Sequence, residues 1–286
     1  MSTNFSELSL ELTKNISKKE KKENGIFFTP LNIIKIMIEK LQGFSFNTIL
    51  EPSCGSCEFI NYLDNIYNNK IITGIEINKT IYNHIKTIKL NNNSLQLINK
   101  NYLDNDNNFY DLIIGNPPFY VINNKTNIIK EYKKYYDGRA NIFILFIIHS
   151  LKKLNDNGIL AFVLPKNFMN CNYYNKIRKF IYENYKIIDL IDCSNSNFID
   201  TTQDTIIIII QNNKNSNNED FIIKQKDFII YNNKTNIIKL KALCHICKDD
   251  TEGLFTMRLS KENEQISIGV DNYIAVCRKH YLENQN

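Results

Sequence analysis

Short apolar runs alternate with amphipathic stretches along the first two thirds of the chain. Residues 47–50, 71–76, 95–98 and 110–115 are apolar runs of the length expected for buried strands. Between these runs, apolar residues recur at helical spacing, most clearly over 31–41. Strands that alternate with helices predict a doubly wound α/β fold with a mostly parallel sheet. In such a sheet the ligand site lies at the carboxyl ends of the strands.

The chain divides into four segments by composition. Residues 1–24 are polar and include a Lys/Glu cluster, which predicts a solvated helix or a flexible arm. Residues 25–211 carry the alternating pattern and form the predicted catalytic domain. Residues 212–240 are rich in Asn and Lys around two apolar strands, which indicates a variable extension. Residues 241–286 form a predicted small module of their own.

Composition and charge indicate an ordinary globular protein. The chain has 286 residues, of which 43% are hydrophobic and 23% are charged, with a net charge of +5. No apolar stretch approaches the roughly 20 residues that span a bilayer, and the N-terminal residues do not resemble a signal sequence. We therefore expect a soluble intracellular protein. Seven cysteines are an odd number for such a chain, so we expect metal binding or burial rather than disulfides.

The tetrapeptide Asn116–Pro117–Pro118–Phe119 follows the fourth apolar run and carries the candidate chemistry. The Asn116 amide oxygen and the carbonyl of Pro117, held by fixed proline geometry, can present two acceptors in one direction. The Phe119 ring offers a face for stacking. This arrangement suits a planar aromatic amine such as adenine N6. A strand that ends in a Pro-Pro turn is the simpler alternative.

A small-residue loop follows the first apolar run and leads into a predicted helix near Glu58. Such a loop lets the main chain approach a ligand closely. It contains one glycine, so the dinucleotide phosphate-binding pattern is not met. Glu51 opens the loop and would suit a cationic or amine-bearing ligand. Glu76 ends the second run, where a carboxylate commonly accepts both hydroxyls of a ribose.

The ordered set FFTP, EPSCGSCEF, GIE, NYL and NPPF resembles the adenine-N6 DNA methyltransferases of the class whose cofactor motifs precede the catalytic motif, as in type II restriction-modification systems. The resemblance covers roughly residues 25–211 and continues through 138–143, 158–168 and 205–210. It implies a Rossmann-like methyltransferase fold with a mostly parallel sheet of seven strands. It also implies S-adenosylmethionine as cofactor and double-stranded DNA as substrate.

The same resemblance implies roles for individual residues. The methionine part of the cofactor would be held by Phe28, Thr29, Pro30, Glu51, Pro52, Ser53, Cys54 and Gly55. Glu76 would hold the ribose, Asn101 and Tyr102 the cofactor's adenine, and Asn116 would also contact the cofactor. Two positions depart from the family pattern, since Asn101 replaces the usual Asp and Cys57 replaces a frequent Gly.

The implied reaction is direct in-line methyl transfer. Asn116 and the Pro117 carbonyl would accept both N6 hydrogens and localise the nitrogen lone pair toward the methyl group. The target adenine would have to flip out of the duplex, at a cost of a few kcal/mol. Phe119 would stack on one face of the base, and Phe198 is the candidate for the other face. Phe198 also suits a core position, because it leads into a strand.

Cations interleaved with aromatic residues follow the catalytic tetrapeptide. The candidate DNA-backbone contacts are Lys130, Lys133, Lys134 and Arg139. The aromatic residues between them, Tyr132, Tyr135 and Tyr136, would suit stacking on an unstacked base. Because lysine is over-used throughout the chain, a merely solvated loop is the alternative.

Two Cys/His pairs lie in the C-terminal segment. Cys244 and Cys247, with Cys277 and His280, have the ligand count of a structural tetrahedral zinc site, and reduced cysteines in a core are the alternative. The segment also resembles the zinc and lasso region of thymidine kinases, with matches over 255–259 and 269–273. The chain has no phosphate-binding Gly-X-X-X-X-Gly-Lys-Ser/Thr loop, which argues against kinase activity.

We therefore expect a site-specific DNA adenine-N6 methyltransferase. The enzymatic alternative is methylation of RNA adenine or of protein glutamine by the same pair of acceptors, Asn116 and the Pro117 carbonyl. The non-enzymatic alternative is a zinc-stabilised protein that binds nucleic acid without catalysis. The predicted recognition region is short for reading several base pairs. Loose specificity, a homodimer, and a companion nuclease or specificity subunit therefore all stay open.

Overall fold

The computed structural model describes residues 4–104, 107–122, 131–139, 141–193, 198–199, 201, 203–213 and 218, and four short strands at 221–224, 229–232, 255–258 and 273–276. Contacts divide the chain into two units, residues 1–231 and 232–286. The division falls inside the predicted extension over 212–240.

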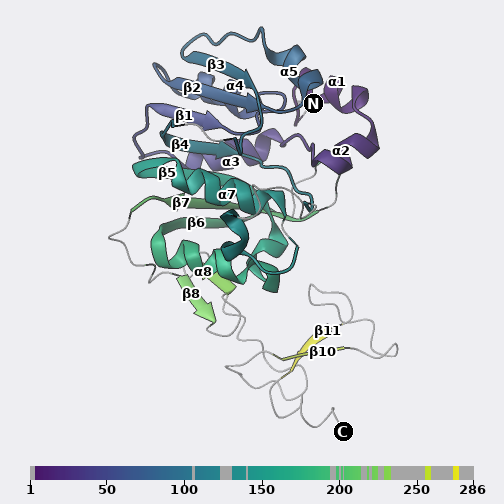
Figure 1. Cartoon of the computed structure of the whole chain (residues 1–286), viewed down its shortest axis with the longest axis vertical. Coiled ribbons are helices and arrows are strands. Elements are labelled where there is room, and N and C mark those ends of the chain that lie inside the picture. The colour runs from purple at the N-terminus through teal and green to yellow at the C-terminus, as the bar shows by residue number, and fades with distance from the viewer. Residues whose placement is uncertain are drawn as a thin grey trace. The chain divides into compact units, whose positions relative to one another are not determined.

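The first unit is built on a seven-stranded sheet with the order β3-β2-β1-β4-β5-β7-β6 (Figure 1). Its strands are β1 (Thr48–Glu51), β2 (Ile71–Glu76), β3 (Ser94–Asn99), β4 (Tyr110–Gly115), β5 (Leu154–Pro165), β6 (Lys186–Asp192) and β7 (Thr205–Gln211). Strands β1 to β5 pair in parallel, and β7 runs antiparallel to both of its neighbours. The predicted mostly parallel sheet of seven strands is confirmed.

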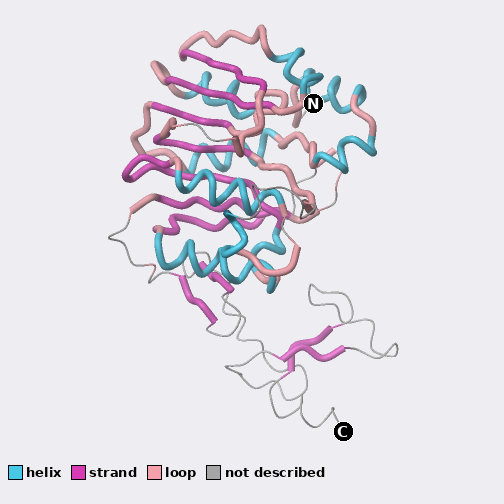
Figure 2. Tube along the Cα trace, in the orientation of Figure 1, coloured by secondary structure: helices cyan, strands magenta, loops and turns pink. Residues whose placement is uncertain are grey.

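Helices cover both faces of the sheet (Figure 2). They are α3 (Leu31–Lys40), α4 (Glu58–Ile66), α5 (Lys79–Ile85), α7 (Ile142–Lys152) and α8 (Asn175–Asn184), with short 3-10 turns η1 (Lys133–Tyr135), η2 (Lys166–Met169) and η3 (Asn172–Tyr174). Residues of α3 and α4 share one apolar cluster with the sheet, and residues of α7 and α8 share another. The central strands are therefore buried on both faces, which explains their near-continuous apolar runs.

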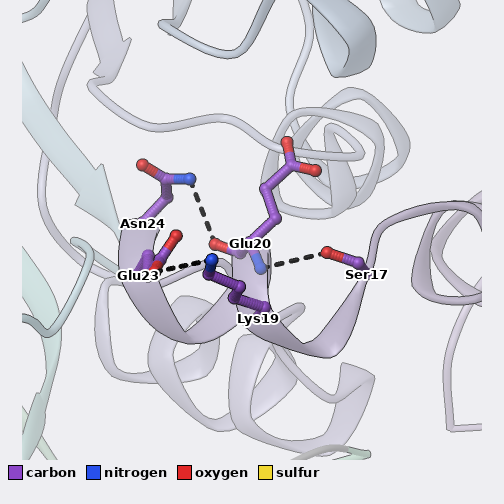
Figure 3. Close-up of polar contacts among 5 residues, drawn as sticks. All are labelled: Ser17, Lys19, Glu20, Glu23 and Asn24. Atoms are coloured by element: carbon purple, nitrogen blue, oxygen red, sulfur yellow. Dashed lines mark hydrogen bonds and ion pairs between the residues drawn. The ribbon is translucent and has the colours of Figure 1, made fainter.

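Two capped helices precede α3. Helix α1 (Glu7–Asn15) begins at Ser6, whose hydroxyl accepts from Ser9 N, and α2 (Lys18–Asn24) begins at Ser17. Figure 3 shows the Ser17 cap, the Lys19–Glu23 ion pair and the bond from Asn24 to the Glu20 carbonyl. The predicted polar N-terminal segment therefore contains two helices, over 7–15 and 18–24.

Helix α1 is tied to the start of α4. The Glu58 carboxylate accepts from Ser6 N at 3.1 Å and from the Ser9 hydroxyl at 2.5 Å. Leu12 and Ile16 pack with Phe28 and with Ile81 of α5 in a small apolar cluster. Burial of side chains of this size contributes about 1.5–3 kcal/mol each, so α1 is held by apolar packing as well as by hydrogen bonds.

Four short strands lie beyond the main sheet. Strands β8 (Phe221–Lys224) and β9 (Ile229–Asn232) form one two-stranded sheet. In the second unit, β10 (Phe255–Arg258) and β11 (Tyr273–Val276) pair antiparallel. The four predicted zinc ligands, Cys244, Cys247, Cys277 and His280, lie outside the described residues, as does Lys130. Among the helices that are described, none has both the length and the apolar character needed to cross a bilayer.

Candidate active site

A cavity of about 240 Å³ opens at the carboxyl ends of β1, β2 and β4. Nine residues predicted from the sequence line it, namely Phe28, Pro52, Ser53, Gly55, Glu76, Asn101, Tyr102, Asn116 and Pro118. A smaller hollow beside it is lined by Thr29, Glu51 and Cys54. The strand order explains the gathering, because β2, β1 and β4 are neighbours and their ends meet at one edge of the sheet.

Glu76 ends β2 at the wall of the cavity. Its Oε2 accepts from Gly55 N at 3.0 Å, and its Oε1 accepts from Asn78 N at 2.6 Å. Burial raises the pKa of the Glu76 carboxyl, while these main-chain donors pull that pKa down. Each carboxylate oxygen has a second lone pair, so the group can still accept from a diol.

Glu51 ends β1 and is buried, with 2% of its surface exposed. Its Oε2 has no hydrogen-bond partner among the described residues. Burial raises the pKa of the Glu51 carboxyl well above its usual range, and the acidic groups around it act in the same direction. A buried, unsatisfied oxygen at this edge suits a cationic ligand, whose charge would favour the carboxylate.

The loop after β1 is held against β2 and β4. Cys54 N donates to the Ile75 carbonyl at 2.9 Å, and the Ser53 hydroxyl donates to the Asn116 carbonyl at 3.2 Å. Cys57 takes a left-handed conformation with φ of 64°, immediately before α4. Glycine adopts this conformation at least cost, so the geometry is consistent with the resemblance, which implied a glycine where this chain has Cys57.

Asn101 and Tyr102 follow β3 and line the cavity. The Asn101 Oδ1 accepts from Leu103 N at 3.2 Å, and its amide nitrogen donates to Asp104 at 3.2 Å. Tyr102 is buried, and its hydroxyl shares a hydrogen bond of 2.8 Å with Ser150 of α7. The amide oxygen of Asn101 retains a second lone pair, so the position can accept from an amine without supplying charge.

Asn116 follows β4 and belongs to the cavity wall. Its Nδ2 donates to the main-chain carbonyl of Phe27 at 3.2 Å. Its Oδ1 is buried and has no hydrogen-bond partner among the described residues. A buried acceptor without a donor costs about 1–3 kcal/mol, so this oxygen is poised for a donor that a ligand would bring.

The two predicted base-stacking residues lie in different surroundings. Phe119 is partly buried, and its ring meets the ring of Phe143 edge to face at 5.9 Å. Phe198 is 8% exposed and belongs to the apolar cluster on the α3 and α4 face. Phe119 thus stands beside the cavity residue Pro118, whereas Phe198 packs in the core.

In the described part of the basic segment, the cations are exposed and the tyrosine rings are buried. Lys133, Lys134 and Arg139 are exposed. Tyr132, Tyr135 and Tyr136 are buried, with at most 8% of their surface exposed. The Lys133 ammonium lies 4.9 Å from the Tyr136 ring centroid. The expectation that these tyrosines offer a face to an unstacked base is therefore wrong, because their rings belong to the core.

Several cavity residues were not anticipated from the sequence. They are Asn24, Gly25, Ile26, Phe27, Ile77, Asn78, Ile81, Lys100, Tyr120, Ile142 and Phe146. Ile77 is 67% exposed, an unusual exposure for an isoleucine directly after a strand-ending carboxylate. Ile77 and Asn78 could have been predicted from their position directly after Glu76, because the loop after a strand of a doubly wound sheet borders the ligand site. Gly25 and Phe27 gave no side-chain signal, since they act through the main chain.

The residues fit an S-adenosylmethionine molecule by three observations. Glu76 presents a buried carboxylate at a strand end, and the cavity that it lines is also lined by apolar groups such as Phe28 and Ile81. Glu51 presents an unsatisfied buried oxygen for a cation in the smaller hollow. These features match the diol, the positive charge and the purine of that cofactor.

Comparisons with known proteins agree with this geometry. A family model described as N-6 DNA Methylase matches residues 5–271. Type II methyltransferase M.CvrRI of Paramecium bursaria Chlorella virus XZ-6E is 33% identical over 201 residues, which are 69% of this chain and 51% of that protein. Modification methylase CviBIII of Paramecium bursaria Chlorella virus NC1A is 30% identical over 208 residues, which are 68% of this chain and 52% of that protein.

Among solved structures, the M protein of the type I restriction enzyme EcoKI superposes with a TM-score of 0.54 over 88% of this chain and 63% of that chain, at 15% identity. At this identity the likeness is one of fold. The present chain spans about half the length of the two viral relatives.

Proposed function

Since this chain belongs to the N-6 DNA methylase family, we propose that it transfers a methyl group from S-adenosylmethionine to the N6 amine of a specific adenine in double-stranded DNA. The observation that carries the proposal is the buried, unpartnered Oδ1 of Asn116 at the cavity wall. An exocyclic amine is the kind of donor that this oxygen lacks.

The chain's own residues position the amine, and the proton that the nitrogen loses on methylation would pass to water. Asn116 Oδ1 and the Pro117 carbonyl accept its two hydrogens, which directs the nitrogen lone pair into the cavity. Glu76 binds the ribose hydroxyls of the cofactor, and Glu51 favours its positive charge. An electrophilic methyl group is what S-adenosylmethionine supplies when it is bound. Orientation of the amine in the cavity then lowers the barrier.

A stacked adenine cannot reach this cavity, so the target base flips out of the duplex. Phe119 stacks on the flipped base, supported from behind by Phe143 at 5.9 Å. Phe198 stays the candidate for the opposite face only if it leaves its core position when DNA binds. Lys130, Lys133, Lys134 and Arg139 contact DNA phosphates, a role that the exposure of the last three supports.

The test is a methyl-transfer assay with labelled cofactor on duplex DNA, RNA and protein, followed by single-molecule mapping of methylated adenines. We expect label in duplex DNA, at adenines that share a sequence motif. Label in RNA or in glutamine side chains would establish the enzymatic alternative. Absence of transfer to all three, combined with DNA binding, would establish the non-catalytic alternative.

The quaternary organisation is a separate part of the proposal. The region predicted to follow the catalytic domain is short for reading several base pairs, which favours a contribution from a further surface. We propose that a second copy or a companion specificity or nuclease subunit supplies it. Light scattering of the protein alone and with target DNA distinguishes a homodimer from a monomer that needs a partner.

We also propose that Cys244, Cys247, Cys277 and His280 bind one structural zinc ion. The support is their spacing in the sequence, two close pairs on either side of the β10–β11 hairpin. Metal analysis of the purified protein should find about one zinc per chain, and Cys244→Ser should release it. Absence of zinc, with cysteines that react freely with a thiol reagent, would refute the site.

A further inference from the structure

We propose that the main chain of Gly25 to Phe27 is a positioning element of the catalytic site, which sets the rotation of the Asn116 amide so that its oxygen faces the target amine. This inference rests on the proposed function, because it explains how Asn116 presents an acceptor, and not a donor, to the target amine. Gly25 is the positioning residue, since its position places the Phe27 carbonyl.

An asparagine amide has two chemically opposite ends. Rotation by half a turn about the last side-chain bond would exchange Oδ1 for an NH2 group, which would meet an amine donor to donor. The carbonyl of Phe27 can only accept, and it lies 3.2 Å from Asn116 Nδ2. It therefore holds the nitrogen end and leaves the buried Oδ1 for the ligand. The Ser53 hydroxyl holds the Asn116 main chain at 3.2 Å, so the whole residue is fixed.

Gly25 lies directly against the catalytic tetrapeptide. A Cβ at this position would stand 2.7 Å from Phe119 N and 3.0 Å from Pro118 Cβ. Gly25 also ends α2 in a left-handed conformation with φ of 64°. The conformation favours glycine and the close approach requires it, so any side chain here would displace either this turn or the tetrapeptide.

The positioning segment is anchored on both sides. Gly25 is the C-cap of α2, and its N–H and that of Ile26 both donate to the Lys21 carbonyl. On the other side, Phe28 packs in the small apolar cluster with Leu12 of α1. The two helices before Gly25 thus give the Phe27 carbonyl a fixed place, which explains why a polar N-terminal segment is folded onto this edge of the sheet.

The first test compares Gly25→Ala with Gly43→Ala. Gly43 also has a positive φ, of 97°, but a Cβ there would meet nothing within 4 Å. Both variants carry backbone strain, and only Gly25→Ala pushes on the tetrapeptide. In single-turnover methylation at saturating cofactor and DNA, we expect Gly25→Ala to be slower than wild type by roughly 100-fold. Gly43→Ala should stay within about 3-fold. Equal rates for the two variants would overturn the proposal.

The second test uses the pH dependence of Asn116→Asp. A carboxylate oxygen facing the Phe27 carbonyl is repelled, whereas a protonated acid can donate to that carbonyl and still accept with its other oxygen. The methylation rate of this variant should therefore rise as pH falls, relative to the wild-type profile. A variant that is as active as wild type, with the same pH profile, would show that Phe27 does not orient residue 116.

Crystal structures give a readout that does not need activity. The wild-type structure should retain the Asn116–Phe27 bond, and Gly25→Ala should lengthen or break it while Gly43→Ala keeps it. A wild-type protein that methylates nothing would refute the proposed function, and the crystallographic comparison would still decide the positioning role. Loss of the bond in wild type would refute the positioning role even in an active enzyme.

Discussion

The carboxylate of Glu20 accepts a hydrogen bond from the side-chain amide of Asn78 at 3.1 Å, across 58 positions of the chain. Asn78 also donates its main-chain N–H to Glu76 and caps α5 with its side-chain oxygen. Helix α2 is therefore joined to the residues that follow β2 and line the cavity. In Figure 3 the Glu20 carboxylate points away from the Lys19–Glu23 pair on the same helix.

This contact predicts that Glu20→Ala weakens cofactor binding. Loss of a charge-assisted bond of this kind costs about 1.5–3 kcal/mol at most, and less where water can replace it, so we expect a decrease in affinity of about 3- to 10-fold. Glu20→Gln keeps an acceptor and should stay close to wild type. Glu23→Ala, an exposed change on the same helix, is the control. Calorimetric titration with S-adenosylmethionine measures all three, and equal affinities would contradict the role of the contact.

Asn116→Ala should strongly slow methylation while cofactor binding is largely retained. Removal of a preorganised group that polarises the reacting atom typically lowers the rate by about 100- to 1,000-fold. Cofactor affinity should change by only a few-fold, because Glu51 and Glu76 are untouched. Asn184→Ala, at an exposed position of α8, is the matched control. A variant that still methylates at the wild-type rate would remove Asn116 from the mechanism.

Glu51→Gln should make the stability of the ligand-free protein less dependent on pH. Burial raises the pKa of Glu51 in the folded protein, so the unfolded chain, with a pKa of about 4.3, releases the proton first. Wild-type stability therefore falls as pH rises from that value through the raised folded pKa, by about 1.4 kcal/mol per unit of elevation. Melting temperatures from about pH 5 to about pH 8 test this. Glu39→Gln, an exposed change on α3, should keep the wild-type slope.

Cys57 should tolerate glycine better than alanine. Its φ of 64° strains any residue with a Cβ, so Cys57→Gly relieves strain that Cys57→Ala retains, while both lose the same buried sulfur. We expect the glycine variant to be more stable than the alanine variant by about 1 kcal/mol in urea unfolding. Cys193 is also buried but lacks a positive φ, so there alanine should be the more stable. If the glycine and alanine variants had the same order of stability at both positions, strain at Cys57 would be contradicted.

Removal of the exposed cations should change how DNA binding responds to salt. If Lys133, Lys134 and Arg139 each neutralise one phosphate, replacing all three with alanine should reduce the slope of log K against log salt by about 3. Replacement of Lys35, Lys86 and Lys89, which are exposed elsewhere, is the control. Fluorescence anisotropy with a labelled duplex over a salt series measures both. An unchanged slope would show that the basic segment is only a solvated surface.

The sheet and its ligand edge were predictable because buried strands leave a strong apolar signal. The runs 71–76 and 110–115 match β2 and β4 as observed, and 47–50 and 95–98 are within one residue of β1 and β3 at each end. The placement of Glu51, Glu76 and Asn116 followed from the rule that parallel strands end at one edge. These predictions depend on periodicity and topology, which the side chains encode directly.

The N-terminal half of the site was not predictable by the same means. Helix α2 has the sequence KKEKKEN, which carries no apolar stripe. Its position depends on caps, on the Glu20–Asn78 bond and on the close approach of Gly25. A main-chain carbonyl such as that of Phe27 has no sequence signature at all. The prediction that the tyrosines at 132, 135 and 136 stack on a base was wrong because their spacing in the sequence does not distinguish exposed rings from core rings.

The bond between Phe27 and Asn116 spans 89 positions, and β4 must be laid beside β1 before it can form. Helices α1 and α2 are synthesised well before their partners in the sheet. Helix α1 contacts Glu58, α2 contacts Asn78, and Phe27, which follows α2, contacts Asn116. Nascent chains that end before the fourth strand thus contain the proposed cofactor residues up to Tyr102 but not Asn116, the proposed acceptor for the target amine. We therefore expect methylation activity to appear late in synthesis and in a single step, since contacts between residues far apart in the sequence form only when the sheet assembles.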